Sequence, residues 1–582
     1  MYVEILDPDA EGRGEIVLTN LVSNAFPIIR YRTGDVGSLD PSPCRCGRGL
    51  PKLRGVEGRR TDFLVTPGGR VLHALSAIYI LREIPAVREF RIVAVRSRNA
   101  GRHRARGLAP AHGLGQVPLR RIPGGPAHSR APHGRRLESR SLVHMSEKGK
   151  ICVVGTGHIG LPLAAVLAEA GFEVTGYDTN DDFVTRVNTT GTADFREEGL
   201  DELLTRHLHR SLTLTSNPPE SQDVYIITVG TPLETGTQRP SLERIRVAVQ
   251  RIAPGFGPDP LIILRSTVSI GTTRSVVLPE IRRATQQFGL AFCPERTIEG
   301  KAIPEMRSLP QIVGGLDEES VARAEALFRL ITPTIIRVSS LETAEMIKLI
   351  NNTYRDLTFA FANEVALIAE RMGLSAAEMI RAANVDYPRS NIAQPGFVGG
   401  PCLEKDALIL IDSLKKIDFK PRVIEEARKI NQALPDHVAT RIIDELRGLR
   451  RSPARAKVLI TGFAFKGRPA TEDIRGSAAV PLMRRLQSSR VEIWGHDFVT
   501  PEKVIADLGA RACTLEEGFD NADGVIIMNN HPGYRAANIP ALARRLRAPA
   551  FLFDSWGLFA IQEFREVPGL RYAPLGAPFA SP

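Results

Sequence analysis

Cysteine is scarce in this sequence, and its scarcity limits the kind of protein that the chain can be. The 582 residues include only six cysteines, at positions 44, 46, 152, 293, 402 and 513. Secreted domains that depend on disulfides for stability carry many more cysteines per residue. The count therefore predicts a reduced, cytoplasmic protein without a disulfide framework.

Long apolar runs are also missing. No stretch approaches the roughly 18 consecutive apolar residues that a transmembrane helix needs, and the first residues, MYVEILDPDAEGRGE, lack the apolar segment of a signal peptide. We therefore expect no membrane association. A hydrophobic content of 43% with scattered charges is typical of a globular protein. The length predicts three to four domains, because one hydrophobic core rarely serves so many residues.

Negative charge is scarce at the front of the chain. The net charge is +11, and residues 1–144 hold 24 Arg and Lys against 12 Asp and Glu, so residues 145–582 carry −1, the difference between +11 and +12. Between 101 and 144, nine arginines face the single acid Glu138, and no Phe, Tyr or Trp occurs. A nucleic-acid surface usually combines such charge with stacking aromatics or a folded face. We interpret this segment as solvated and expect no nucleic-acid partner.

Composition divides the chain into five parts. Residues 1–98 alternate short β-rich runs with turn residues, and residues 99–148 are rich in Arg, Pro, Gly, Ala and His without periodicity, which predicts a disordered linker. Beyond the linker, β-branched runs alternate with amphipathic helices, the pattern of doubly wound α/β domains. We expect two Rossmann-like domains, at 149–340 and 451–582, joined by a helical domain at 341–450.

Two segments refine this division. MSEKGKICVVGTGHIG, which begins at Met145, reads like the natural start of an independent protein, so we expect residues 1–144 to be a remnant or a misjoined neighbour. Residues 341–378 contain no proline and a single glycine, Gly373, and apolar residues recur at every third or fourth position. That pattern predicts a long helix, interrupted near Gly373, that bridges two domains.

A glycine-rich turn joins the predicted strand KICVV to the predicted helix LPLAAVLAEAG. Its residues Gly155, Gly157 and Gly160 permit a tight turn and let a pyrophosphate approach the free amides of the helix N-terminus. Asp178 ends the next strand, where an acid can accept hydrogen bonds from both ribose hydroxyls and so favours NAD over NADP. The combination indicates an NAD site, and a glycine turn without ligand is the alternative.

Cys402 lies in the glycine-rich stretch QPGFVGGPCLEKD, residues 394–406. A lone cysteine is more often an inert core residue, but the glycines and the proline before it predict an exposed loop. Lys405 would favour the thiolate, and Asp406 could act through water as a base. These residues alone leave the two readings equally open. A reactive thiol beside NAD would allow an alcohol to be oxidised past the aldehyde to a thioester.

Seven motifs in order make the resemblance to a known family specific. They are GTGHIG (155–160), TVGTP (228–232), RSTVSIGT (265–272), CPERTIEG (293–300), AEMIKLINN (344–352), GGPCLEKD (399–406) and GFAFKGRPATEDIRGS (462–477). From Lys150 to about Gly576 the chain resembles the UDP-glucose and UDP-N-acetylhexosamine 6-dehydrogenases. The resemblance implies an N-terminal NAD domain, a helical centre that forms a homodimer or a higher oligomer, and a C-terminal UDP-sugar domain.

The resemblance assigns catalytic roles. Cys402 matches the nucleophile, and Lys348 and Asn352 match the pair that holds the developing oxyanion, with an i, i+4 spacing that places both on one helix face. Helical periodicity alone would make Lys348 an ordinary solvated charge. These matches imply that an aldehyde formed from the substrate is trapped by Cys402.

Two further pairs follow from the same resemblance. Thr267 and Asp406 match the residues that position the water receiving the proton of the C6 hydroxyl. Glu295 and Glu299 match the acidic pair near the reacting carbon, where Glu299 fits the hydrolysis of a thioester. Taken alone, Glu299 would be an ordinary surface acid.

The resemblance also implies the ligand contacts, and it implies no metal. The residues that match the NAD-binding set are Gly155, Gly157, His158, Ile159, Gly160, Asp178, Thr231, Thr267 and Lys405. Those that match the substrate-binding set are Lys348, Asn352, Gly399, Lys466 and Arg475. Arg475 and Lys466 suit the UDP diphosphate or the sugar, because a bidentate Arg contact fits an anion. Each of these two would otherwise be a solvated surface charge.

The implied reaction is a four-electron oxidation of the C6 hydroxyl of a UDP-sugar to a uronate, with two NAD reduced per product. The form PER…GK…LPQIVGG that begins at Pro294 resembles the branch that oxidises UDP-N-acetylmannosamine or UDP-N-acetylglucosamine, whose products usually serve polysaccharide biosynthesis. UDP-glucose is the alternative. Two residues depart from the family pattern: His158 replaces a common aromatic, and Glu404 stands where proline is frequent and would raise the pKa of the nearby thiol.

Residues 1–98 resemble the C-terminal part of adenylate-forming ligases of the phenylacetate–CoA ligase type. RYRTGD (30–35) and CRCGRGLPKLRGVEGRRTDF (44–63) carry this resemblance, which implies that Asp35 would bind an AMP ribose. The part that binds ATP phosphates is missing, so we expect no adenylation from a vestigial piece.

Other functions remain open from the sequence. A two-electron hydroxyacid dehydrogenase shares the Rossmann unit and the Lys–Asn helix, but Cys402 and the second α/β domain disfavour it. A ligase or nucleotide-binding module carried by residues 1–98 and a non-catalytic nucleotide-sugar sensor are more remote.

Overall fold

The computed structural model describes residues 2–9, 12–19, 31–40, 42, 52–59, 63–65, 71–73, 149–234 and 239–582. These residues belong to two compact units, 1–134 and 135–582. The linker predicted at 99–148 and the predicted strand FRIVAVRS (90–97) lie outside the described residues.

The described residues of the first unit lie mainly in short strands, as the β-rich composition of residues 1–98 predicts. Four of these strands form an antiparallel sheet in sequence order, and two more pair separately. Asp35, the predicted AMP-ribose ligand, lies opposite Arg59 in the register of the third and fourth strands. The strands are β1 (Tyr2–Leu6), β2 (Arg13–Thr19), β3 (Tyr31–Asp40), β4 (Lys52–Arg59), β5 (Phe63–Val65) and β6 (Val71–His73).

The second unit contains an eight-stranded sheet that the chain builds outward from its first strand, in the order β14-β13-β12-β11-β10-β7-β8-β9. β13 runs antiparallel to β12, and the other pairs are parallel. The chain adds β8 and β9 on one side of β7 and β10 to β14 on its other side. The strand order therefore reverses between β7 and β10, and in such sheets ligands bind at this switch point, at the carboxyl ends of the strands. The strands are β7 (Lys150–Val154), β8 (Glu173–Tyr177), β9 (Leu212–Thr215), β10 (Val224–Ile227), β11 (Leu261–Leu264), β12 (Gly289–Phe292), β13 (Gln311–Gly315) and β14 (Ile335–Arg337).

Helices cover both faces of this sheet. Side chains of β7 alternate between two separate cores: Ile151 and Val153 pack into one buried cluster, and Cys152 and Val154 pack into another. A strand buried on both faces needs the continuous apolar run that KICVV provides. The helices are α2 (Gly160–Glu169), α3 (Asp181–Thr190), α4 (Leu200–His207), α5 (Glu243–Ile252), the π-helix η2 (Thr273–Val277), α6 (Leu278–Ala284), α7 (Ala302–Ser308) and α8 (Glu318–Phe328).

A second, all-parallel sheet of six strands has the order β17-β16-β15-β18-β19-β20. Here too the order in which strands are added reverses, between β15 and β18. Two buried hydrophobic clusters flank the sheet. The strands are β15 (Lys457–Thr461), β16 (Glu492–His496), β17 (Arg511–Ala512), β18 (Gly524–Ile527), β19 (Ala550–Asp554) and β20 (Leu570–Pro574). The helices are α13 (Ala479–Ser488), α14 (Glu502–Asp507), α15 (Leu515–Phe519), α16 (Pro532–Ala536) and α17 (Ile539–Ala543).

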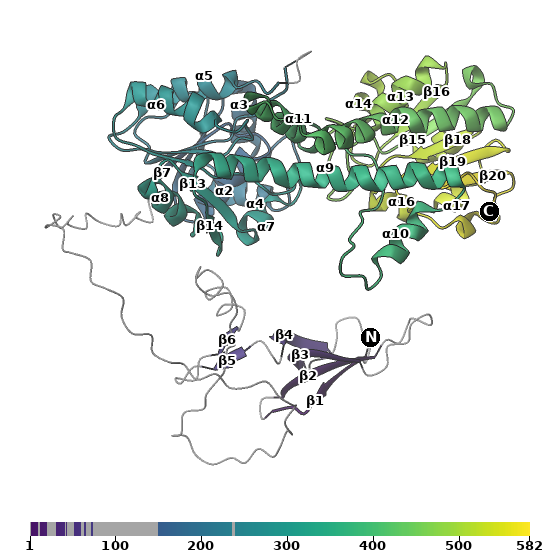
Figure 1. Cartoon of the computed structure of the whole chain (residues 1–582), viewed down its shortest axis with the longest axis horizontal. Coiled ribbons are helices and arrows are strands. Elements are labelled where there is room, and N and C mark those ends of the chain that lie inside the picture. Colours follow the sequence, from purple (N-terminus) through teal and green to yellow (C-terminus); the bar gives the residue numbers. More distant parts are fainter. Residues whose placement is uncertain are drawn as a thin grey trace. The chain divides into compact units, whose positions relative to one another are not determined.

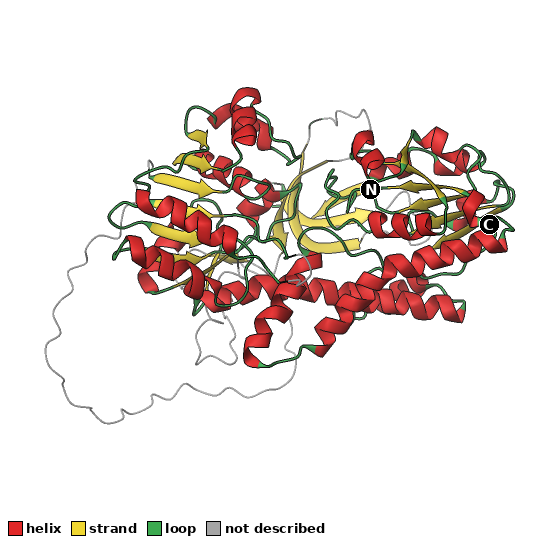
Figure 2. Cartoon of the chain, turned by 90° about the horizontal axis from the view of Figure 1, so that it is seen from above, coloured by secondary structure: helices red, strands yellow, loops and turns green. Residues whose placement is uncertain are grey.

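Long helices join the two sheets, and Figures 1 and 2 show them running from one α/β part to the other. The predicted bridging helix is α9 (Leu341–Met372). Its N-cap Ser340 accepts a hydrogen bond from the Thr343 amide, and Gly373 ends it with a φ of +69°. The other helices of this central part are α10 (Ala376–Asn384), α11 (Leu403–Leu414) and α12 (Arg422–Gly448). The predicted fold class, two Rossmann-like domains joined by helices, is confirmed.

Among the helices of the described residues, none has the length and apolar character that crossing a membrane requires.

Candidate active site

One cavity of about 810 Å³ collects residues from both sheets and from the central helices. Its walls include the glycine turn after β7, the loops that follow β10, β11 and β12, helix α9, the segment before α11 and a loop of the second sheet. The predicted site residues in its lining are Gly155, Gly157, His158, Ile159, Asp178, Thr231, Thr267, Glu295, Glu299, Lys348, Cys402, Lys405 and Arg475. The predicted NAD residues other than Gly160 therefore face the same space as the predicted nucleophile.

The glycine turn after β7 is too tight for side chains at two of its glycines. Gly155 has a φ of +88°, and a Cβ at Gly160 would lie 1.8 Å from the Gly155 carbonyl oxygen. At Gly157, by contrast, no heavy atom of the described residues would lie within 4 Å of a Cβ. A pyrophosphate can therefore approach this backbone and the N-terminus of α2, so the turn fits NAD.

Asp178 follows the carboxyl end of β8 and is fixed beside the glycine turn. Its Oδ2 accepts from the Thr156 amide at 2.8 Å, and its Oδ1 accepts from the Asn180 amide at 3.0 Å. A carboxylate oxygen can accept more than one hydrogen bond, so both can also take a ribose hydroxyl. Its negative charge would repel a 2′-phosphate, so this geometry fits NAD better than NADP.

Side chains from the central helices tie down the loop that carries Thr267. Thr231 Oγ1 donates to the Thr267 carbonyl oxygen at 2.6 Å, and Lys405 Nζ of α11 donates to Thr231 O and Oγ1 at 3.2 Å each. Glu345, buried on α9, accepts from the amide of Thr273 at 2.7 Å. The position of Thr267 is therefore set by helices that also carry the predicted catalytic residues.

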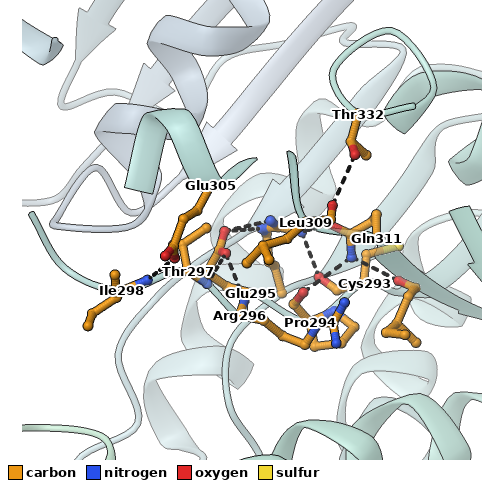
Figure 3. Close-up of polar contacts among 12 residues, drawn as sticks. Cys293, Pro294, Glu295, Arg296, Thr297, Ile298, Glu305, Leu309, Gln311 and Thr332 are labelled. Carbon is orange, nitrogen blue, oxygen red and sulfur yellow. Dashed lines mark hydrogen bonds and ion pairs between the residues drawn. The ribbon is translucent and has the colours of Figure 1, made fainter. Parts of the chain in front are cut away.

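Glu295 forms a buried ion pair with Arg265. Arg265 Nη2 lies 2.5 Å from Glu295 Oε2, and Nη1 donates to Gln311 Oε1 at 2.8 Å. Glu295 Oε1 accepts from the amides of Arg296 and Thr297 at 2.7 and 2.8 Å (Figure 3). Burial alone would raise the pKa of Glu295, but Arg265 and the Thr297 amide lower it overall. Glu295 therefore presents a fixed negative charge to the cavity.

Glu299 is held by two residues of the second sheet's domain. Thr471 Oγ1 donates to Glu299 Oε1 at 2.6 Å, and Lys466 Nζ donates to the Glu299 carbonyl oxygen at 2.6 Å. Glu197 accepts from the next amide, that of Gly300, at 2.8 Å. Lys466 is not among the lining residues of the cavity, and its contact with substrate stays a prediction.

Cys402 comes directly before α11, and its side chain is exposed toward the cavity. Although the side chain faces the cavity, the surrounding protein removes water from the thiol, and this burial raises its pKa. The Asp406 carboxylate raises the pKa further, while Lys348 and Lys405 lower it. The thiol therefore lies between opposing charges that set how readily it forms a thiolate.

Asp406 lies one helical turn after Cys402 and is fully buried. Its Oδ2 accepts from Asn352 Nδ2 at 2.6 Å, while its Oδ1 has no hydrogen-bond partner among the described residues. Burial raises the pKa of Asp406, and Lys348 and Lys405 lower it in part. Asn352 and Asp406 do not line the cavity, and Asp406 Oδ1 is a buried acceptor without a partner among the described residues.

The segment before α11 packs tightly on the second sheet's domain. A Cβ at Gly399 would lie 2.2 Å from the Gly476 carbonyl oxygen, to which the Gly400 amide donates at 3.2 Å. A Cβ at Gly476 would lie 2.5 Å from the Glu404 Cδ, so the Glu404 carboxyl group lies against Gly476. Gly399 therefore acts through close backbone approach. After burial, the acids that raise the pKa of the Cys402 thiol are Asp406 and, to a smaller extent, Glu299.

Charged side chains of three elements meet at the edge of the cavity. Arg475 Nη2 donates to Asp473 Oδ2 at 2.6 Å, and the His158 ring stacks on Phe195 with centroids 4.2 Å apart. Burial lowers the pKa of His158, although Glu299 and Asp473 oppose the shift. One nitrogen or oxygen atom from each of His158, Glu299 and Asp473 lies within 4.8 Å of the other two, a spacing that could hold a metal ion. However, Asp473 already forms an ion pair with Arg475.

Sequence alone did not indicate four residues that organise this site: Arg265, Glu345, Thr471 and Asp473. All four belong to quoted motifs, RSTVSIGT, AEMIKLINN and GFAFKGRPATEDIRGS, so a signal was present. What the motifs do not reveal is the partner, because Arg265 meets an acid 30 residues away and Thr471 meets one 172 residues away.

Three models of one protein family match consecutive parts of the chain. They are described as the NAD binding domain (residues 149–332), the central domain (342–433) and the UDP binding domain (459–560) of the UDP-glucose/GDP-mannose dehydrogenase family. The three matched ranges follow the order of the first sheet, the central helices and the second sheet.

Individual proteins give the same picture. A UDP-N-acetyl-D-mannosamine dehydrogenase of Pyrococcus horikoshii is 31% identical over 407 residues, which are 68% of this chain and 93% of that protein. An NDP-N-acetyl-D-galactosaminuronic acid dehydrogenase of Ralstonia nicotianae is 31% identical over 412 residues, 68% of this chain and 94% of that protein. The solved structure of a UDP-D-ManNAc dehydrogenase from Pyrococcus horikoshii has a TM-score of 0.67 at 30% identity, covering 73% of this chain and 99% of that one.

Proposed function

Because this chain belongs to the UDP-glucose/GDP-mannose dehydrogenase family, we propose that it oxidises the C6 hydroxyl of a UDP-sugar to the carboxylate through a covalent intermediate on Cys402. It is an NAD-dependent oxidoreductase. The observation that carries the proposal is that one cavity contains both the glycine turn of the NAD domain and the Cys402 thiol.

The residues that would hold NAD line one part of this cavity. Gly155 and Gly157 leave room for the pyrophosphate at the N-terminus of α2, and Asp178 would accept the ribose hydroxyls. When bound, NAD supplies the acceptor for a hydride in each of the two oxidations, so one alcohol, one water and two NAD give one carboxylate, two NADH and three protons.

The first oxidation needs a proton acceptor and a fixed charge near the reacting oxygen. Asp406 offers a buried Oδ1 without a partner among the described residues, and with Thr267 it would position the water that takes the C6 hydroxyl proton. Lys348, almost buried in the cavity wall, would stabilise the developing oxyanion. Asn352 supports this arrangement by donating its amide to Asp406 Oδ2.

The second oxidation depends on Cys402. Its sulfur would attack the aldehyde carbon and form a thiohemiacetal, whose loss of a hydride leaves a thioester. Water then cleaves the carbon–sulfur bond, which releases the carboxylate and returns the thiol. Glu299, oriented by Thr471 and lining the cavity, would assist the attack of that water. Glu295 keeps a second negative charge close to the site through its ion pair with Arg265.

We propose that the sugar carries an N-acetyl group, as UDP-N-acetylmannosamine or UDP-N-acetylglucosamine. Relatives named UDP-N-acetyl-D-mannosamine dehydrogenase are about 30% identical over two thirds of the chain, which supports this choice over UDP-glucose. In this proposal Arg475, Lys466, Gly399, Lys348 and Asn352 contribute to the substrate site. The uronate would serve as a precursor for a surface polysaccharide.

Each of the three domains has a separate role in the proposed reaction. We propose that residues 149–340 bind NAD, residues 341–450 carry the catalytic helix and dimerise, and residues 451–582 bind the UDP-sugar. A stripe of exposed apolar side chains on α9 supports the homodimer: Met346, Ile350, Tyr354, Phe361, Ile368 and Met372 recur at helical spacing. We also propose a cytoplasmic location, in keeping with the unpaired thiols of the described cysteines.

A panel of nucleotide sugars tests the proposed function. The full chain would be incubated with NAD and UDP-N-acetylmannosamine, UDP-N-acetylglucosamine, UDP-glucose or GDP-mannose, and NADH and the sugar acid would be measured. We expect one N-acetylated UDP-sugar to exceed UDP-glucose in kcat/KM by about tenfold or more. A preference for UDP-glucose would refute the choice of sugar. If no UDP-sugar led to NADH formation, the function would be refuted.

A further inference from the structure

Four buried polar side chains on α9 and α12 connect the two ends of the segment that carries Cys402. We propose that these residues, Asp356, Asn363, Arg428 and Asn431, form a clamp that positions the Cys402 sulfur against the catalytic residues of α9. This clamp deepens the proposed function, since it rests on the role of Cys402 as the nucleophile. Its members are positioning residues: they act on the thiol through the backbone of the segment Gly396–Leu403.

The first end of the clamp holds Gly396. Asn363 Nδ2 donates to the Gly396 carbonyl oxygen at 3.0 Å, and the Gly396 amide donates back to Asn363 Oδ1 at 2.9 Å. Asn363 Nδ2 also donates to Asn431 Oδ1 at 2.9 Å. One side chain amide therefore fixes both polar groups of a glycine that would otherwise rotate freely.

The other end holds Leu403, the residue after the thiol. Asn431 Nδ2 donates to Asp356 Oδ1 at 2.8 Å, and Asp356 Oδ1 accepts from Arg428 Nη1 at 2.6 Å. The same Arg428 Nη1 donates to the Leu403 carbonyl oxygen at 2.9 Å. An unbroken chain of hydrogen bonds thus leads from Gly396 to Leu403 through the protein interior.

The segment between these ends has little structure of its own. Residues 391–399 form no helix or strand, and Cys402 is placed just before the first turn of α11. All four clamp side chains are buried, so their hydrogen bonds do not compete with solvent and their loss would leave polar groups unpaired. A buried ion pair is a costly way to gain stability alone, which favours a positional role for Asp356 and Arg428.

Helix α9 carries both the clamp residues and the proposed catalytic residues. Lys348, Asn352, Asp356 and Asn363 follow one another along one face, at intervals of four, four and seven residues. The first two are the proposed oxyanion pair, and the last two are clamp residues. One rigid helix therefore fixes both the charge that meets the oxyanion and, through the clamp, the sulfur that attacks.

Two variants open the clamp at opposite ends, and one control variant matches them. Arg428→Met removes the bond to Leu403, and Asn363→Ala removes both bonds to Gly396. Arg441→Met is the control, because Arg441 is a half-buried arginine of α12 that, like Arg428, pairs with an acid of α9. Its partner is Glu370, and it contacts Ala577 instead of the segment. The measurements are kcat, KM, the melting temperature and the rate of Cys402 alkylation by iodoacetamide across pH, read by peptide mass.

We expect both clamp variants to lower kcat by about 10- to 100-fold with little change in the KM for NAD, because a small displacement of a reacting group is costly. The rate or the pH profile of Cys402 alkylation should change in both, since the sulfur moves relative to Lys348 and Asp406. Arg441→Met should melt earlier but keep kcat and alkylation near the values of the unaltered chain. Clamp variants that fold and behave like Arg441→Met would overturn the proposal.

If neither clamp variant folds, hydrogen exchange of the unaltered chain decides. A peptide covering residues 392–398 should retain a slowly exchanging amide, that of Gly396, and complete fast exchange of this peptide would overturn the proposal. Failure of the clamp and failure of the proposed function are distinguishable. The alkylation rate and hydrogen exchange report on the clamp and need no substrate. The proposed function is tested separately, by whether Cys402→Ala loses turnover.

Discussion

At the scale of single residues, Cys402 differs from the other described cysteines in what surrounds its sulfur. Burial raises the pKa of Cys293 to about 12 and that of Cys513 to about 11, and both are enclosed in the cores. Cys402 is exposed toward a cavity, with Lys348 and Lys405 opposing the effects of burial and of Asp406. Nearby charges therefore control its reactivity, and changing one should change the pH at which it reacts.

Two substitutions should move that pH in opposite directions. Lys348→Met removes a cation that lowers the pKa of the Cys402 thiol, so alkylation of Cys402 should require higher pH. Asp406→Asn removes an anion that raises this pKa, so alkylation should begin at lower pH. The rate of iodoacetamide labelling against pH measures both, and Lys429→Met, which changes an exposed lysine of α12, is the control. Shifts in the same direction would contradict the charge assignment.

Removal of the thiol tests the covalent step. Cys402→Ala should abolish formation of the sugar acid, while the binding of the UDP-sugar measured by calorimetry changes by less than about tenfold, because the thiol acts only on the aldehyde. Cys513→Ala, which removes an enclosed thiol of the second sheet's domain, should still form acid. Acid formation by Cys402→Ala at an unchanged rate would refute the thioester scheme.

At the scale of elements, helix α9 has two faces with different tasks. The face with Lys348 and Asn352 meets the cavity and α11, and another face exposes the apolar stripe from Met346 to Met372. Phe361 and Tyr354 in that stripe are 52% and 68% exposed, an amount of apolar surface that a second copy of the chain would cover.

Charge on that stripe should therefore separate the proposed dimer. Phe361→Glu should shift the chain from dimer to monomer in sedimentation at micromolar concentration, because a carboxylate would have to be buried in an apolar contact. Arg355→Glu, which alters an exposed charge of α9 away from the stripe, should leave the assembly intact. An unchanged mass for Phe361→Glu would show that α9 does not form the interface.

The elements themselves were largely predictable from the sequence. Runs such as KICVV and LIIL are short, contain β-branched residues and are bounded by Gly, Pro or Arg, and they form β7 and β11. The helix predicted at 341–378 ends at Gly373 because glycine adopts a positive φ. Pairing between distant side chains was not predictable. Nothing in the motif around Asp406 reveals that its carboxylate meets Asn352, 54 residues away, or that Arg428 reaches Leu403.

At the scale of the whole molecule, the described residues that line the proposed site all belong to the unit 135–582. A chain that begins at Met145 should therefore keep kcat within about twofold of the full chain, because every described residue that lines the cavity is retained. NADH production by the two proteins under identical conditions measures this. Loss of activity on truncation, with the melting temperature unchanged, would show that residues 1–144 contribute to catalysis.

The number of NADH formed per UDP-sugar consumed decides whether Cys402 forms a covalent intermediate, because only a second oxidation at the same carbon makes use of Cys402 beside the NAD residues in one cavity. Absorbance of NADH and mass spectrometry of the sugar product, followed to completion with limiting UDP-sugar, give this ratio. We expect two NADH for each uronate. A ratio of one, with the aldehyde as the final product, would contradict it.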